Sequence, residues 1–83
     1  MNKIIIRVYI PGLELSYDIK VPINKKIYKI TRLIVKAINE INGGFYTPNK
    51  LPLMYNKKTA TPYNMKLTFK DANIKNGTEI ILL

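Results

Sequence analysis

The clearest pattern in the chain is a helical one between Asn24 and Gly44. Apolar side chains recur there at steps of three and four residues, the spacing of one face of an α-helix. Asn24 can accept hydrogen bonds from the first free N–H groups, and Gly43 or Gly44 can take the left-handed conformation that ends a helix. β-branched residues favour a helix only weakly, so burial must hold it in place. The expected apolar stripe consists of Ile27, Ile30, Leu33, Ile34, Ala37, Ile38 and Ile41.

Two stretches before this helix alternate between apolar and polar residues. Lys3–Ile10 and Leu13–Val21 both have period two, and Pro11 and Gly12 between them form turns readily. The pattern predicts an antiparallel hairpin with one apolar face. The residues expected to face inward are Ile4, Ile6, Val8, Ile10, Leu13, Leu15, Tyr17, Ile19 and Val21.

The chain after the helix predicts a third strand at Leu51–Tyr55. Its alternation places Leu51, Leu53 and Tyr55 inward and Met54 outward. Pro52 cannot donate a hydrogen bond to the ladder, so it favours an edge position or an irregular start. A further weak strand is expected near Thr61–Met65.

The last part of the chain predicts a compact turn and a closing strand. Thr68 is a candidate N-cap for a turn that runs to Ile74, with Phe69, Ala72 and Ile74 directed to the core. Asn76 and Gly77 form a strong turn signal. Thr78–Leu83 is nearly all apolar, so we expect a central strand, parallel to the first, with Ile80 and Leu82 inward.

These elements predict an α+β fold in which a mixed four- to five-stranded sheet packs on one α-helix. The chain has 83 residues, of which 47% are hydrophobic. This length and composition suit a single domain over residues 1–83, with one core.

The composition excludes several kinds of chemistry. There is no cysteine and no histidine, so disulfides, thiolate sites and imidazole catalysis are absent. Glu14 and Asp18 share one strand face but lie about 13 Å apart, too far for a catalytic carboxylate pair. A phosphate-binding loop ends in a similar way to Lys57, Lys58 and Thr59, but the glycines that precede that ending in such a loop are missing here. The sequence therefore predicts no enzyme and no cofactor. No apolar run reaches a membrane span or resembles a signal peptide, which favours a cytoplasmic protein.

The closing segment from Leu67 to Leu82 reads LTFKDANIKNGTEIIL. It resembles the end of ubiquitin-like β-grasp domains, where a short helical turn precedes the last strand, and the hairpin and helix fall in the same order. The resemblance implies a ubiquitin-like β-grasp fold. Conjugated ubiquitins and sulfur carriers end in Gly-Gly, whereas this chain ends at Leu83, so we expect no reactive tail.

Leu13–Pro22 together with Asn73–Leu83 resembles the YukD/EsaB group, small ubiquitin-like proteins of bacterial type VII (WXG100) secretion. That resemblance implies a cytoplasmic, non-catalytic and non-conjugated adaptor or regulatory protein. It also implies a protein partner, for which the FtsK/SpoIIIE-like secretion ATPase is the candidate.

Two surfaces are candidates for binding. In ubiquitin-like proteins the outer sheet face is a common recognition surface, and Met54 falls at its centre by resemblance. Scattered exposed residues or a homodimer are the alternatives for this apolar face. The residues expected to bind protein there are Ile5, Arg7, Tyr9, Met54, Ile81 and Leu83.

The second candidate surface is a basic helix face made of Lys25, Lys29, Arg32 and Lys36. The whole chain has a net charge of +9. This face is interpreted as a solvated surface, a contact for an acidic protein, or a contact for nucleic acid. A basic nucleic-acid-binding module of a mobile element or phage is therefore the alternative function.

Overall fold

The first and last strands of the chain lie side by side in the middle of one sheet. The structure, a computed structural model that describes residues 2–83, has five strands in the order β2-β1-β5-β3-β4. β1 pairs antiparallel with β2 and parallel with β5, and β3 pairs antiparallel with β5 and β4. The strands are β1 (Lys3–Ile10), β2 (Leu15–Pro22), β3 (Met54–Asn56), β4 (Thr61–Pro62) and β5 (Glu79–Leu82). This confirms the predicted mixed sheet and the central, parallel last strand.

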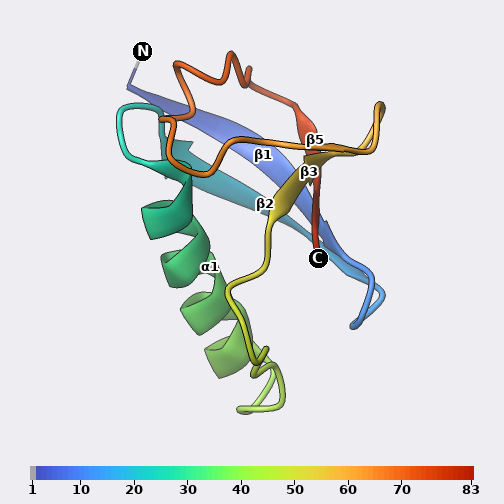
Figure 1. Cartoon of the computed structure of the whole chain (residues 1–83). Helices are drawn as coiled ribbons and strands as arrows, with labels where there is room; N and C mark the ends of the chain where they lie inside the picture. Colours follow the sequence, from blue (N-terminus) through green and yellow to red (C-terminus); the bar gives the residue numbers. More distant parts are fainter. Residues whose placement is uncertain (1) are drawn as a thin grey trace.

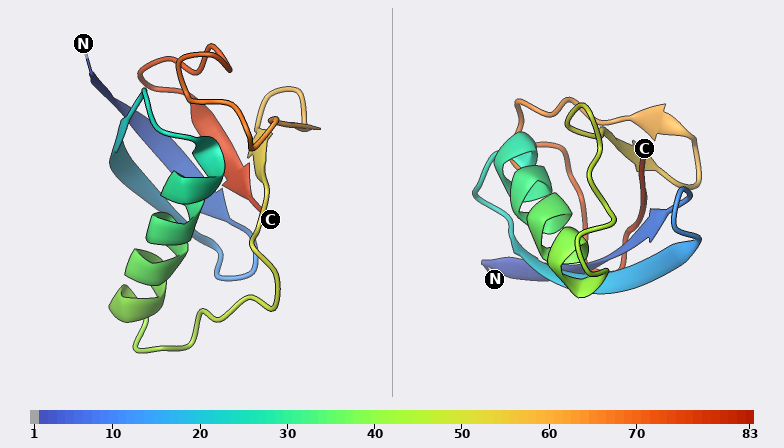
Figure 2. Two further views of the ribbon diagram at one scale, coloured as in Figure 1. Left: turned by 60° about the vertical axis from the view of Figure 1, so that its left-hand side comes forward. Right: turned by 90° about the horizontal axis from the view of Figure 1, so that it is seen from below.

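The single helix of residues 2–83, α1 (Ile27–Ile41), covers one face of this sheet (Figure 1). It lies toward β1 and β2, and β3 and β4 form the other side of the domain (Figure 2). The predicted α+β class is therefore confirmed. Within the described residues, no helix combines the length and apolar character needed to cross a membrane. The buried core consists of Ile4, Ile6, Val8, Ile10, Val21, Ile27, Ile30, Ile34, Ile38, Met54, Phe69, Ile74, Ile80 and Leu82.

The two ends of α1 are held in different ways. The predicted cap at Asn24 is wrong, because the helix begins after Lys26 and has no side-chain cap. Instead the backbone N–H groups of Ile27 and Tyr28 donate to the carbonyl oxygens of Leu67 and Met65, at 2.8 and 3.0 Å. A segment distant in sequence therefore satisfies the free donors at the start of the helix.

The other end of the helix follows the prediction. Gly43 and Gly44 have φ angles of 65° and 87°. Their N–H groups donate to the carbonyls of Glu40 and Asn39 respectively, which is the paired closure of a Schellman motif.

The apolar stripe of α1 is only partly buried. Ile27, Ile30, Ile34 and Ile38 face the core, whereas three predicted stripe residues, Leu33, Ala37 and Ile41, are exposed. The expectation that these three are buried is wrong, because β2 is the last strand on that side of the sheet. The polar residue Thr31 is fully buried on α1, and its hydroxyl donates a hydrogen bond to the carbonyl of Ile27 at 2.8 Å.

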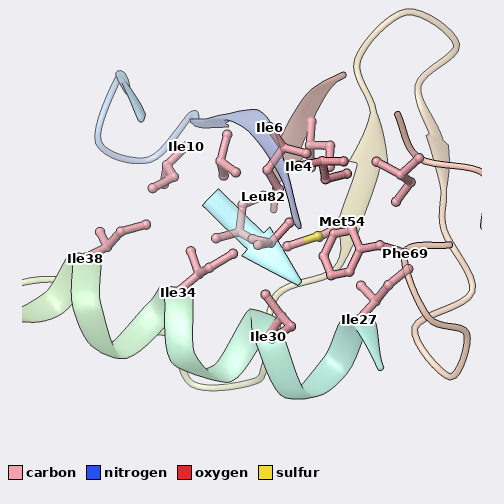
Figure 3. Close-up of a cluster of buried hydrophobic side chains, with 14 residues drawn as sticks. Ile4, Ile6, Ile10, Ile27, Ile30, Ile34, Ile38, Met54, Phe69 and Leu82 are labelled. Atoms are coloured by element: carbon pink, nitrogen blue, oxygen red, sulfur yellow. The ribbon is translucent and has the colours of Figure 1, made fainter. Parts of the chain in front are cut away.

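The irregular segment before β5 closes one end of the core. The hydroxyl of Thr68 accepts a hydrogen bond from the N–H of Asp71 at 3.0 Å, which confirms Thr68 as a cap. Phe69 and Ile74 are buried and Ala72 is half-buried, also as predicted. Phe69 lies between Met54 and Ile27 in Figure 3.

Met54 does not face outward as the sequence predicted. Its side chain is fully buried and points into the core (Figure 3), whereas Leu51 and Leu53 are exposed. The strand begins at Met54, which pairs directly with Leu82, and Leu82 itself faces the core. Side chains alternate along a strand, so an error of one residue in register reverses every face assignment.

Candidate protein-binding surface

One row of apolar side chains crosses the outer face of the sheet, the face opposite α1. Tyr9 in β1 is in register with Ile81 in β5, which is in register with Tyr55 in β3. Pro62 of β4 continues the row beside Tyr55. Residues directly opposite one another in neighbouring strands project to the same side. Four strands therefore supply one continuous apolar row.

A second apolar pair lies next to this row. Leu53 and Leu83 exchange two backbone N–H···O hydrogen bonds of 3.0 Å, which extends the pairing of β3 with β5. Both project outward, since Met54 and Leu82 beside them project inward, and their exposed fractions are 41% and 68%. We call the part of this surface that β1, β3 and β5 and their adjoining residues supply the outer patch, and Pro62 of β4 lies at its margin. The outer patch consists of Tyr9, Leu53, Tyr55, Ile81 and Leu83.

Charged side chains of alternating sign form a row beside the outer patch. Arg7 stands directly opposite Asp18 of β2 on one side and Glu79 of β5 on the other. Its guanidinium donates to both carboxylate oxygens of Asp18, at 2.9 and 3.3 Å. The Lys57 ammonium lies 3.2 Å from the Glu79 carboxylate and 5.9 Å from the centre of the Tyr9 ring. The two positive and two negative charges of this row cancel, although the whole chain carries +9.

The Arg7–Asp18 pair makes stability depend on pH. The hydrogen bond from Arg7 lowers the pKa of Asp18 below its ordinary value of 3.8. A lowered native pKa adds stability above the unfolded pKa, and this stability is lost as the pH falls through the native pKa. Both groups are more than half exposed, so we expect a small effect that salt weakens further.

We therefore expect Asp18→Asn to lose less stability than the parent chain as the pH falls below about 4. Urea denaturation over a series of acidic buffers measures this difference. Glu40→Gln removes a carboxylate outside the row and is the matched control for the loss of one negative charge. If Asp18→Asn and the parent lost the same stability as the pH falls, the Arg7–Asp18 pair would not be the cause of the pH dependence.

The structure brings together some of the predicted binding residues and separates others. Tyr9, Ile81 and Leu83 belong to the outer patch, and Arg7 lies beside it. Ile5 is on the same face with 47% exposure, but the charged row lies between it and the patch. Met54 is excluded from the surface, because it is fully buried.

Tyr55 and Leu53 occupy the position on the outer sheet face that the sequence analysis assigned to Met54. The sequence analysis expected Tyr55 and Leu53 to face the core. The chemistry of the Met54 and Tyr55 side chains could have indicated which one faces outward. Met54 is wholly apolar, whereas Tyr55 carries a hydroxyl that needs water or a partner, so Tyr55 suits the outer face better.

The predicted basic residues are all exposed, and Lys29, Arg32 and Lys36 follow one another at steps of three and four residues along α1, so they share the side of the helix that faces away from the core. Lys25 precedes the helix, and Lys29 and Lys36 are exposed on α1. The Arg32 guanidinium lies 5.3 Å from the centre of the Tyr28 ring. Arg32 also lines a shallow depression with residues 48–52 of the connection after the helix.

Solved structures were compared with this fold. The EccD5 ubiquitin-like domain from Mycobacterium xenopi is similar over 100% of this chain and 94% of its own, with a TM-score of 0.81 and 11% sequence identity. The chain has the ubiquitin-like β-grasp fold. The ubiquitin-like domain of the Mycobacterium tuberculosis type VII secretion protein ECCD1 matches with a TM-score of 0.71 and 18% identity, over 95% of this chain and 97% of its own.

The same β-grasp fold occurs within larger assemblies. A chain of the MycP5-free ESX-5 inner membrane complex matches 100% of this chain with 21% of its own length, a TM-score of 0.79 and 10% identity. A chain of the toluene 4-monooxygenase HD complex matches with a TM-score of 0.78 and 9% identity, over 96% and 95%. No protein-family model and no curated protein matches the sequence. At these identities the similarity establishes the fold, and function has to be argued from the surfaces.

Proposed function

We propose that this β-grasp domain is a non-catalytic protein-binding module of a bacterial type VII secretion system, acting in the cytoplasm. The observation that carries the proposal is the outer patch, in which three strands present five adjoining apolar side chains opposite the helix. Contiguous exposed apolar surface in a small domain favours a protein interface. The similarity to ubiquitin-like domains of type VII secretion proteins supports that setting.

The charges around the outer patch suit a protein partner better than a polyanion. The neighbouring row is neutral, with Arg7 and Lys57 each paired to a carboxylate. An apolar centre with a polar rim is the usual anatomy of a protein interface. Within this proposal the domain is an accessory or regulatory component, as in the YukD/EsaB group, and its partner is the FtsK/SpoIIIE-like ATPase.

The absence of cysteine and histidine from the sequence supports action by binding. Nucleophilic and acid–base catalysis near neutral pH most often use those side chains.

The test of the outer patch is Ile81→Glu. Ile81 lies between Tyr9 and Tyr55 at the centre of the patch, so a carboxylate there should weaken capture of the secretion ATPase's cytoplasmic part at least tenfold, or about 1.4 kcal/mol. Surface plasmon resonance with the immobilised full chain measures the affinity. Phe45→Glu adds the same charge at an apolar residue that is 88% exposed and outside the patch, and should bind normally.

Normal binding by Ile81→Glu would remove the outer patch from the proposal. A nucleic-acid-binding module remains the second candidate, because the chain carries +9. It predicts that labelled DNA or RNA binds both variants, with an affinity that falls steeply with salt.

A further inference from the structure

The outward side of α1 is strongly basic, and the positive charge continues around the start of the helix. Two lysines from the segment before β5 are held there by backbone hydrogen bonds. The N–H of Lys70 donates to the carbonyl of Ile23 at 2.9 Å, and the carbonyls on either side of Lys66 accept from the first two N–H groups of α1. We call this region the basic surface. It consists of the exposed residues Lys25, Lys26, Lys29, Arg32, Lys36, Lys66 and Lys70.

The charges of the basic surface are not neutralised nearby. Both ion pairs found within residues 2–83 lie in the charged row beside the outer patch, and neither involves a residue of the basic surface. Two acids, Glu40 on α1 and Asp71 beside Lys70, lie close to it, so its positive charges outnumber the negative ones. The outer face of the sheet is therefore locally neutral, whereas the helix side attracts anions.

Exposed apolar side chains lie among these charges. Leu33 is four residues after Lys29 and three before Lys36, so it is a neighbour of both on the helix surface. Leu33 and Ile41 have exposed fractions of 62% and 67%. A helical surface that combines lysine and arginine with exposed leucine and isoleucine suits the boundary between water and lipid.

We propose that the basic surface binds the anionic surface of a membrane, with α1 lying along it. The lysine and arginine side chains are long enough to reach lipid phosphates, and Leu33 enters the headgroup layer between them. Nucleic acid offers phosphates but no apolar layer for Leu33 and Ile41, so a bilayer satisfies more of the surface. The attraction acts over about one Debye length and adds up over the basic residues, so it needs no cavity and no fixed ion pair.

Membrane binding through α1 leaves the outer patch free. The patch lies on the sheet face opposite α1, so a domain held by its helix presents Tyr9, Tyr55 and Ile81 away from the lipid. The proposal goes beyond the proposed function, because the two use opposite faces of the domain. It adds a reason why one small domain carries a neutral apolar face and a strongly basic one.

The test uses the full chain and lipid vesicles in a flotation assay. We expect the chain to float with vesicles of phosphatidylglycerol and phosphatidylcholine at low salt, to be released as salt is raised, and not to float with phosphatidylcholine alone. Lys29→Glu combined with Lys36→Glu should weaken binding at least about tenfold. Lys58→Glu combined with Lys75→Glu is the matched control. It makes the same change in net charge at exposed lysines outside the basic surface, and should weaken binding less than about threefold.

A fluorescent reporter determines which face meets the lipid. The chain contains no tryptophan, so a single one can be introduced on either face. Leu33→Trp places it among the lysines of α1, and Ile5→Trp places it at an exposed position on the outer face of the sheet. Brominated lipid in the phosphatidylglycerol vesicles should quench the fluorescence of Leu33→Trp and leave that of Ile5→Trp unchanged.

Three outcomes would overturn the membrane proposal: no flotation with phosphatidylglycerol vesicles at low salt, equal losses in the two double-lysine variants, or equal quenching of the two tryptophans. Duplex DNA that binds the parent and is lost in the Lys29→Glu, Lys36→Glu variant, without any flotation, would assign the basic surface to nucleic acid instead. The Ile81→Glu measurement is made in solution without lipid. Failure of the membrane proposal and failure of the outer patch are therefore distinguishable.

Discussion

Met54→Asp is expected to unfold the domain at neutral pH. Met54 has no exposed surface and lies beside Leu82 in the layer between the sheet and α1. A carboxylate placed there loses its hydration without a basic partner, which costs at least several kcal/mol. A domain of 83 residues has a total stability of only about 5–10 kcal/mol. Far-UV circular dichroism and the dispersion of amide NMR signals measure the loss of structure.

The neighbouring residue supplies the decisive control for this prediction. Tyr55→Asp changes the adjacent position, whose side chain faces outward in register with Ile81, so it should remain folded. Met54→Leu conserves the buried volume and should cost less than about 1.5 kcal/mol. A folded Met54→Asp together with an unfolded Tyr55→Asp would show that the strand register is the reverse of the one described.

Phe69→Ala is expected to lower the stability by about 4 kcal/mol. The Phe69 side chain is fully buried and closes the end of the core near Met54 and Ile27 (Figure 3). Its backbone is fixed on both sides, because its carbonyl accepts from Ile74 and the next N–H, of Lys70, donates to Ile23, at 3.0 and 2.9 Å. The segment therefore cannot collapse readily into the cavity that alanine leaves. A loss of this size lowers the Tm by roughly 20 °C in a domain of this length.

The other phenylalanine of the chain is the matched control. Phe45 is 88% exposed in the connection after α1, so Phe45→Ala should change the stability by less than about 0.5 kcal/mol. Differential scanning calorimetry compares the two variants directly. Equal shifts of the Tm would mean that Phe69 does not seal the core.

The sequence alone was sufficient to predict the elements, and their buried faces, where the periodic pattern was long. The alternation of Lys3–Ile10 predicted β1 with the observed bounds, and the spacing of Ile27, Ile30, Ile34 and Ile38 predicted the buried face of α1. The apolar closing strand was correctly expected to be central, with Ile80 and Leu82 inward. In these elements many residues repeat the same preference, so one ambiguous position does not alter the result.

The candidate site was predictable only in part, since short strands lack that redundancy. β3 has three residues, and the pattern of Leu51–Tyr55 fits either face assignment when Pro52 interrupts it. Its pairing with Leu82 of β5 decided that Met54 is inside and Tyr55 outside. The outer patch therefore shares Tyr9, Ile81 and Leu83 with the prediction but has a different centre.

Two further features depended on segments distant in sequence. The start of α1 is capped by the carbonyls of Met65 and Leu67, so the local signal at Asn24 was not used. Leu33 and Ile41 belong to the apolar stripe, yet they are exposed because the sheet ends at β2. The sequence by itself determined which residues are suited to burial and with what period. Only the tertiary structure decided which of them have a neighbour to cover them, because the number and register of the strands depend on contacts between distant parts of the chain.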